Sequence, residues 1–234
     1  MKLRVKFSKH GAIKFIGHLD VMRYFQKAIR RAGIDISYTE GFSPHQIMSF
    51  AAPLGVGLES NGEYMDIEVN SITSTRNMLE CLNQQMAEGI QVLEVKLLPN
   101  NAGNAMASVA AAKYTIRFRK GYEPDFAYTT ALTDFYQQEE IIVTKKTKKS
   151  ESTFDMKPFI YDCHLEADGS ISLTVDASSS GNIKPSLVIG AFYEKNGKEL
   201  DDVALMITRE ETYTNIGDET TRTLIPLGAV GEDF

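Results

Sequence analysis

The segments KLRVKFSK (residues 2–9) and LDVMRYFQKAIRRA (residues 19–32) decide the fold class of this 234-residue chain. In the first segment apolar and basic side chains alternate, which predicts a half-buried strand with a basic outer face. In the second segment apolar side chains recur every three or four positions, which predicts an amphipathic helix, and Gly33 is suited to end it. A strand followed directly by a helix indicates a protein of mixed α and β structure.

Further segments extend this start into a complete domain. The patterns predict a strand near 46–51, a strand over 63–69, a helix over 74–88 and a strand over 90–98. The resulting order β-α-β-β-α-β is the split βαβ plan that is called ferredoxin-like. Residues 1–100 are therefore expected to form a ferredoxin-like domain with a basic helix.

The remaining sequence repeats much of this order. Residues 101–112 are small and uncharged, which is typical of a linker. The patterns beyond it predict strands over 114–119, from Ile141, and over 160–166, 170–176 and 203–209, with helices over 125–138 and 185–194. Residues 113–214 are expected to form a second such domain, and residues 215–234 a C-terminal tail. The predicted fold class is α+β, with two ferredoxin-like (split βαβ) domains in tandem.

Composition argues against several classes of protein. The chain has no run of about eighteen apolar residues, so no membrane span is expected. Its N-terminus lacks the apolar stretch of a signal peptide, which favours a cytoplasmic location. Cys81 and Cys163 lie far apart, whereas iron–sulfur and structural zinc sites need several ligands at short spacing. No metal site and no cofactor are therefore expected.

Charge is distributed unevenly along the chain. The net charge is −6, but the first fifty residues carry nine Lys/Arg against three Asp/Glu, and the remainder carries sixteen against twenty-eight. Three of the four histidines, His10, His18 and His45, also lie in the first fifty residues. This asymmetry favours an anionic partner near the N-terminus, either RNA or an acidic protein surface.

One side of the predicted helix 19–32 is the strongest candidate binding surface. Its basic residues follow one another at helical spacing, and such a stripe can track RNA phosphates because Lys and Arg release counterions. The alternative is an ordinary solvated helix face, and a second basic run at 145–149 (KKTKK) is explained as a protected sheet edge. With the nearby loops included, the residues expected to bind the substrate or RNA are Lys9, His10, Lys14, His18, Arg23, Lys27, Arg30, Arg31, Ser43 and His45.

The weaker candidates for catalysis are His10, His18 and Asp20. Imidazole titrates near neutral pH, so the two histidines could act as general acid and base, with Lys14, in cleaving RNA through its 2′-hydroxyl. The alternative roles are phosphate binding and loop orientation for the histidines, and capping of helix 19–32 for Asp20. No nucleophile or triad spacing supports catalysis, so the chain is expected not to be an enzyme.

Residues 9–69 carry the motifs of a known family. The most specific are Gly17-His18-Leu19-Asp20, Arg30-Arg31-Ala32-Gly33, Gly41-Phe42-Ser43-Pro44-His45, Pro53-Leu54-Gly55-Val56-Gly57 and Glu63, with Asp155-Met156-Lys157-Pro158 farther along. The pattern resembles the bacterial family of radical-SAM-linked proteins, a domain of unknown function, over most of the chain. The resemblance implies a protein that is fused to a radical S-adenosylmethionine (SAM) enzyme or encoded beside one. This chain lacks the CxxxCxxC cluster motif, so it is similar to the separate form.

These observations predict an accessory protein that recognises a substrate, with RNA (tRNA or rRNA) favoured, for a separate radical SAM enzyme. The resemblance supplies no catalytic residues. Two alternatives stay open. One is an RNA-processing or RNA-modifying enzyme that uses His10, His18 or Asp20. The other is a protein-interaction module that binds no nucleic acid.

Overall fold

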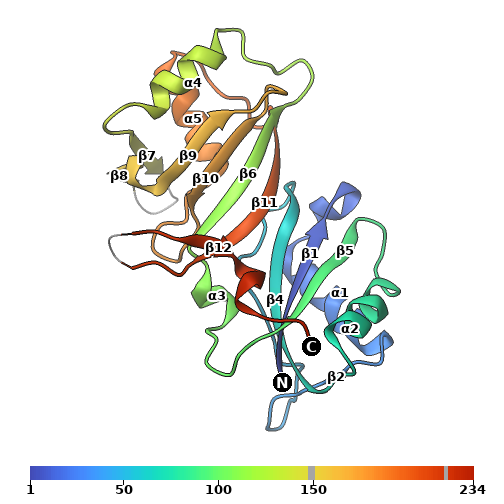
Figure 1. The fold of residues 1–234 in the computed structure, drawn as a ribbon. Coiled ribbons are helices and arrows are strands. Elements are labelled where there is room, and N and C mark those ends of the chain that lie inside the picture. The colour runs from blue at the N-terminus through green and yellow to red at the C-terminus, as the bar shows by residue number, and fades with distance from the viewer. Residues whose placement is uncertain (147–150, 219–220) are drawn as a thin grey trace. The chain divides into compact units, whose positions relative to one another are not determined.

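The computed structural model describes residues 1–146, 151–218 and 221–234 (Figure 1). The chain forms two compact units, of which the first comprises Met1–Ala110 with Arg209–Phe234 and the second comprises Ala111–Thr208. Each unit combines a β-sheet with helices, so the predicted α+β class is confirmed. In the described ranges no helix has the length and apolar character needed to cross a membrane.

The sheet of the first unit runs in the order β5-β1-β4-β11, and β1 is antiparallel to both of its neighbours. Short strands β2 and β3 pair with the later part of β4, and β12 pairs with β11. The strands are β1 (Lys2–Lys9), β2 (Asp35–Ile36), β3 (Met48–Phe50), β4 (Glu59–Ser71), β5 (Ile90–Leu97), β12 (Leu224–Pro226) and residues 209–215 of β11 (Leu205–Asn215).

Two helices, α1 (His18–Arg31) and α2 (Thr75–Asn83), cover one face of this sheet. Leu3, Val5 and Phe7 of β1 join the same buried cluster as Phe25 of α1 and Leu82 of α2. The alternation in residues 2–9 therefore predicted the core face of β1 correctly. Between β1 and α1 the chain forms the 3₁₀ helix η1 (Gly11–Phe15).

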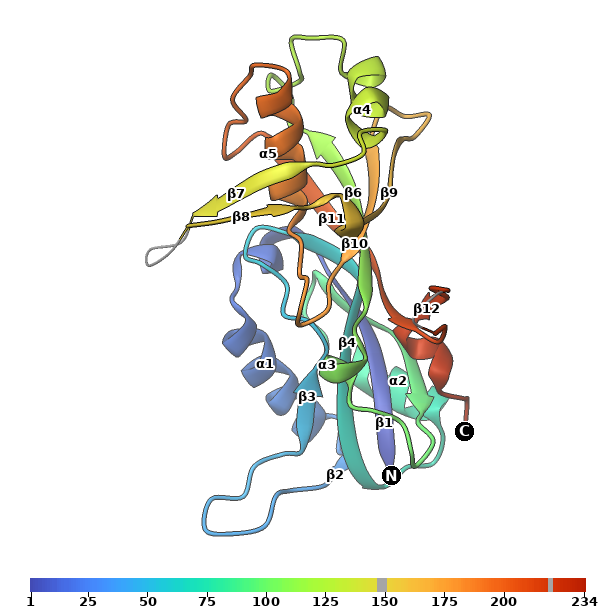
Figure 2. The ribbon, with the colours of Figure 1, turned by 90° about the vertical axis from the view of Figure 1, so that its left-hand side faces the viewer.

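The opposite face of β1 is polar and largely covered, because Arg4 is buried and Lys2 and Lys6 are partly buried, so the prediction of a basic outer face is wrong. Arg4 is 1% exposed, and its Nε and Nη2 donate to the two carboxylate oxygens of Asp66 at 2.8 and 3.0 Å. Its Nη1 donates to the Leu227 carbonyl oxygen at 3.0 Å. Figure 2 shows the C-terminal segment and α1 on opposite sides of the sheet. This face is covered because the end of the chain packs onto it.

The segment expected as a linker belongs to the first unit as far as Ala110, and the segment expected as a tail lies wholly within that unit. Residues 101–112 contain the short helix α3 (Ala105–Ser108), whose Ala105 N–H donates to Asp66 Oδ2 at 2.7 Å. Residues 215–234 contain β12 and the 3₁₀ helix η3 (Leu227–Val230). Backbone hydrogen bonds between Leu97 and Glu232, of 2.8 and 3.0 Å, attach the end of the chain to β5. Buried polar partners, which sequence patterns do not show, decide both placements.

The second unit has the sheet order β9-β10-β6, with residues 205–208 of β11 next to β6. Helices α4 and α5 share one core with this sheet, to which Leu132, Phe135 and Phe192 contribute. A separate hairpin, β7–β8, follows α4. The bounds are β6 (Ala111–Phe118), α4 (Tyr128–Tyr136), β7 (Ile142–Lys146), β8 (Glu151–Asp155), the 3₁₀ helix η2 (Lys157–Phe159), β9 (Ile160–Leu165), β10 (Ile171–Asp176) and α5 (Pro185–Lys195).

Most predicted elements occur near their expected positions. The largest differences are that α2 ends at Asn83 instead of residue 88 and that β11 continues to Asn215 instead of residue 209. Gly33 follows Ala32, the C-cap residue of α1, with a φ of 67°, a left-handed conformation in which glycine is favoured. Residues 147–150 of the basic run 145–149 lie outside the described residues.

Candidate functional site

Helix α1 begins at His18, so the expectation that Asp20 caps it is wrong. The N-cap residue is Gly17, and no side chain donates or accepts a capping hydrogen bond there. Asp20 lies in the first turn, where a carboxylate is favoured by the helix dipole, and pairs with exposed Arg23 at 3.3 Å.

The four basic residues of α1 divide into two groups. Arg23, Lys27 and Arg30 are exposed on the side away from the core. Arg31 is also exposed, but its Nη2 donates to the backbone oxygen of Gln85 beyond the end of α2, at 3.1 Å. Three of the four residues therefore present an exposed cationic surface, which we call the basic side of α1.

Ser43 and His45 lie in the loop of residues 37–46 between β2 and β3, and both are exposed. The loop is closed by a backbone bridge between Tyr38 and Gln46 and by a hydrogen bond of 3.0 Å between Thr39 Oγ1 and His45 Nδ1. His45 therefore helps to hold the loop in shape.

Around the turn that follows β1, His10 and Lys14 converge on a single carboxylate. Lys14 Nζ donates to Glu59 Oε1 at 3.1 Å, and His10 Nδ1 lies 3.4 Å from Glu59 Oε2. The hydrogen bond from Lys14 lowers the pKa of Glu59 below its usual value. His10 Nε2 also lies 2.8 Å from Asn61 Oδ1. Both predicted binding residues thus take part in an internal polar cluster.

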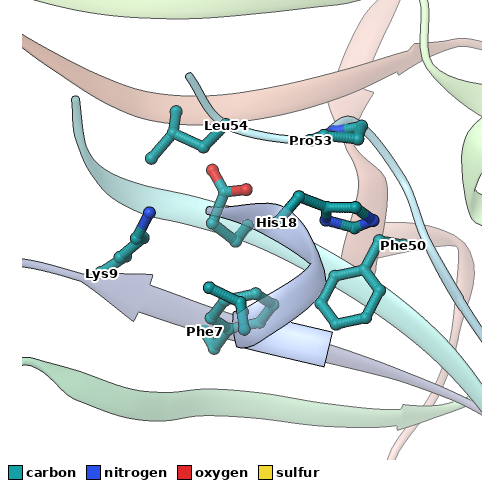
Figure 3. A pocket seen from close by; sticks show the side chains of 8 residues that line it. Phe7, Lys9, His18, Phe50, Pro53 and Leu54 are labelled. Carbon is teal, nitrogen blue, oxygen red and sulfur yellow. The ribbon is translucent and has the colours of Figure 1, made fainter. Parts of the chain in front are cut away.

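Lys9 and His18 line a small cavity of about 20 Å³, enough for a single water molecule (Figure 3). The ring of His18 meets the ring of Phe50 edge-on, with centroids 5.0 Å apart. The cavity is lined by Phe7, Lys9, His18, Val21, Phe50, Pro53, Leu54 and Glu63. A cavity of this volume cannot admit a nucleotide, and neither His10 nor His45 lines it.

An ion pair that the sequence analysis missed borders this cavity. Buried Arg209 donates from Nε to Glu63 Oε1 at 2.8 Å and from Nη2 to Glu63 Oε2 at 2.7 Å. Lys9, also buried, donates to the Ile16 carbonyl oxygen at 2.9 Å. Burial lowers the pKa of Lys9, and this effect is partly opposed by the negative charge of Glu63. Glu63 stood among the family motifs, but nothing in the sequence linked it to a residue so distant along the chain.

The predicted site residues therefore fall into three places in the first unit: the basic side of α1, the loop 37–46, and the turn and cavity at the end of β1. The arrangement offers exposed cations, and the histidines contact structural partners. No group of three or more His, Cys, Asp or Glu side chains among the described residues is arranged to hold a metal ion.

Residues 2–185 match a family described as an uncharacterized protein conserved in bacteria (DUF2344). The chain belongs to this family. No curated protein matches the sequence. One similar solved structure is described as "Crystal Structure of a Cbf5-Nop10-Gar1 Complex", with 11% sequence identity and a TM-score of 0.47. The similarity covers 90% of this chain and 48% of that chain, so this chain spans about half of its length.

Proposed function

We propose that this protein is an RNA-binding accessory partner of a separate radical SAM enzyme, and that it holds the RNA on the basic side of α1. In this role the chain recognises the substrate, of the tRNA or rRNA class, while the partner performs the radical chemistry in the cytoplasm. The observation that carries the RNA part is the exposure of Arg23, Lys27 and Arg30 on one helix.

The charges of these three residues remain available to a ligand. Arg23 has only the exposed pair with Asp20, which contributes little in water. Lys27 and Arg30 form no ion pair within the described ranges. Exposed Lys and Arg side chains gain free energy on RNA because they displace condensed counterions from the phosphates.

The partner part of the proposal is supported by the motifs, which resemble those of radical-SAM-linked proteins. Gly17-His18-Leu19-Asp20 forms the start of α1, and Gly41-Phe42-Ser43-Pro44-His45 forms the tip of the loop 37–46. Leu19 and Asp20 of the first motif and all five residues of the second are exposed, so core packing does not explain these residue types.

The order of the strands in each unit supports the prediction of two ferredoxin-like (split βαβ) domains. In the first unit, the strands that alternate with α1 and α2 lie in the order β5-β1-β4-β3. In the second unit, the corresponding order is β11-β6-β10-β9, with the hairpin β7–β8 as an insertion. Numbered within each unit, both orders are 4-1-3-2, as expected for the split βαβ plan.

The enzyme alternative receives no support from a specific contact. His10 is bound to Glu59 and Asn61, His18 packs on Phe50, and Asp20 pairs with Arg23. These are stabilising contacts of ordinary kinds.

The test is RNA binding across a salt series. We expect the wild-type protein to bind total cellular RNA with steep salt dependence, and the Arg23/Lys27/Arg30→Glu variant to lose this binding. The matched control is Lys120/Lys184/Lys195→Glu, which changes the net charge equally at exposed positions of the second unit and should retain binding. Absence of salt-sensitive binding by the wild type, or equal binding by the α1 variant, would overturn the RNA part.

The partner part has its own test. The tagged protein, purified from its own cells under anaerobic conditions, should co-elute with a protein that carries a CxxxCxxC motif, as identified by mass spectrometry. Failure of any such protein to co-elute contradicts this part. If the enzyme co-elutes but RNA is not bound, the basic side of α1 is a protein-docking surface.

A further inference from the structure

The loop 37–46 presents a fully exposed aromatic side chain at its tip. Phe42 is fully solvent-accessible, and Tyr38 near the base of the loop is 48% exposed. In Figure 2 the loop extends away from β2 and β3. Burial of a phenylalanine side chain stabilises a folded protein, so a fully exposed one forgoes this stabilisation in the free protein.

The geometry of the loop holds Phe42 in this position. The Thr39 N–H donates to the His45 carbonyl oxygen at 2.9 Å, and the His45 N–H donates to Thr39 Oγ1 at 3.1 Å. Gly41, directly before Phe42, has a φ of 107°, which a residue with a side chain rarely adopts. The exposure of Phe42 is therefore produced by an ordered turn.

The base of this loop lies against α1. Gln46 Nε2 donates to the backbone oxygen of Gln26, in the middle of the helix, at 3.2 Å. Arg23 precedes Gln26 by three residues and Arg30 follows it by four, so all three lie along the same side of the helix. Gln46, the last residue of the loop 37–46, therefore contacts α1 on the side that carries Arg23 and Arg30.

We infer that this surface binds single-stranded RNA, with an unpaired base stacked on Phe42 and the neighbouring phosphates on Arg23 and Arg30. The inference rests on the RNA binding proposed above and names the form of RNA that is bound. Cations that track the backbone beside an exposed aromatic ring are the two components of single-strand recognition. The bases inside a duplex are already stacked and paired, whereas unpaired bases are free to stack on an aromatic side chain.

The test compares a 12-nucleotide single-stranded RNA with a blunt-ended duplex of the same base composition and no unpaired bases, by fluorescence anisotropy at one salt concentration. We expect the wild type to prefer the single strand. Phe42→Ala should weaken single-strand binding by about 5- to 150-fold, the equivalent of one stacked base, and leave duplex binding unchanged. Phe234→Ala, a control at another exposed phenylalanine of the first unit, should bind as the wild type does.

Phe42→Trp adds a spectroscopic measurement. The chain contains no tryptophan, so this variant carries a single indole, and stacking on a base should quench its fluorescence while affinity is retained. If Phe42→Ala binds the single strand as tightly as the wild type, or if the indole signal does not change, the inference is wrong although RNA binding at α1 stands. If the wild type binds no RNA, the proposed function itself fails. If Phe42→Ala loses only the co-eluting enzyme, the loop is a protein contact and the inference is also wrong.

Discussion

Strand β1 and helix α1 each contribute four basic residues to the first fifty positions, but the two groups have opposite environments. Arg4 and Lys9 of β1 are buried, and Arg4 forms a bidentate ion pair with Asp66. Arg23 and Lys27 of α1 are exposed, and among the residues that the structure describes their single ion pair is that of Arg23 with exposed Asp20. The charges of the strand are part of the structure, and those of the helix are available for binding.

The difference arises from the sheet. A central strand has neighbours on both sides, and β4 and β11 bring carboxylates to the polar face of β1. Lys6, for example, donates to Glu211 Oε2 at 2.7 Å, and Tyr64 of β4 donates to the other oxygen of Glu211 at 2.8 Å. Part of the acidic excess of the later sequence therefore neutralises the basic excess of the earlier sequence. The net charge of the first fifty residues therefore suggests a larger cationic surface than the protein has, because carboxylates from the later sequence neutralise some of these charges.

The largest expected effect tests the buried half of this comparison. Arg4→Met leaves the Asp66 carboxylate buried without its main partner and should lower the free energy of unfolding by about 3–5 kcal/mol. Arg23→Met, the same substitution in an exposed Arg–Asp pair, should change it by less than about 1 kcal/mol. Urea unfolding followed by circular dichroism measures both. Equal effects of the two substitutions would contradict the distinction between the strand and the helix.

The cover of the polar face can be tested at the end of the chain. Leu227 is fully buried, and its carbonyl oxygen accepts from Arg4, so Leu227→Ala should cost about 2–5 kcal/mol. Ile216→Ala, at an exposed position of the same C-terminal segment, should cost less than about 0.5 kcal/mol. If thermal and urea unfolding show no loss for Leu227→Ala, the C-terminal segment does not pack on the sheet in solution.

A smaller effect is expected from the titration of Lys9. Burial lowers its pKa in the folded protein, so between that pKa and the unfolded value near 10.5 the unfolded chain binds more protons. The free energy of unfolding of the wild type, relative to Lys9→Met, should therefore rise as the pH is raised towards 10.5. Urea unfolding of both proteins at several pH values between 7.5 and 10 checks the slope, and a falling slope would show that Lys9 gains its proton on folding.

The smallest expected change in stability is at the exposed helix. Lys27→Ala should alter the free energy of unfolding by less than about 0.5 kcal/mol. If Lys27 contacts one phosphate, the same variant should reduce the slope of log affinity against log salt by about 0.7 for single-stranded RNA. If Lys27→Ala loses stability but the salt slope does not change, Lys27 has a structural role like that of the buried charges of β1 and does not contact a phosphate.

The elements of the fold were largely predictable because periodicity reports which side of a segment is buried. Alternation in residues 2–9 and helical spacing in residues 19–32 both correspond to observed core faces. Strand β12 and helix α3 were not predicted, because each is short and is held by contacts with distant residues such as Asp66 and Tyr213. Short elements carry too few residues to show a period.

The candidate site was predictable only in part. The basic residues of α1 were found from their spacing. The hydrogen bond from Arg31 to the Gln85 backbone oxygen could not be predicted, because it depends on where α2 ends. The contact of the loop 37–46 with the same helix includes a hydrogen bond from Gln46 Nε2 to the Gln26 carbonyl oxygen, two residues that are twenty positions apart. Neither contact has a pattern in the sequence that could have indicated it.

By itself, the sequence determined the α+β class, the positions of the main helices and strands, and the cationic character of the N-terminal region, because these follow from local periodicity and composition. Only the tertiary structure decided which cations are neutralised and which are exposed. That outcome depends on pairs such as Arg4 with Asp66 and Arg209 with Glu63, whose members are distant along the chain. Such pairs form because burying either charge alone is costly, and the fold brings each to its partner.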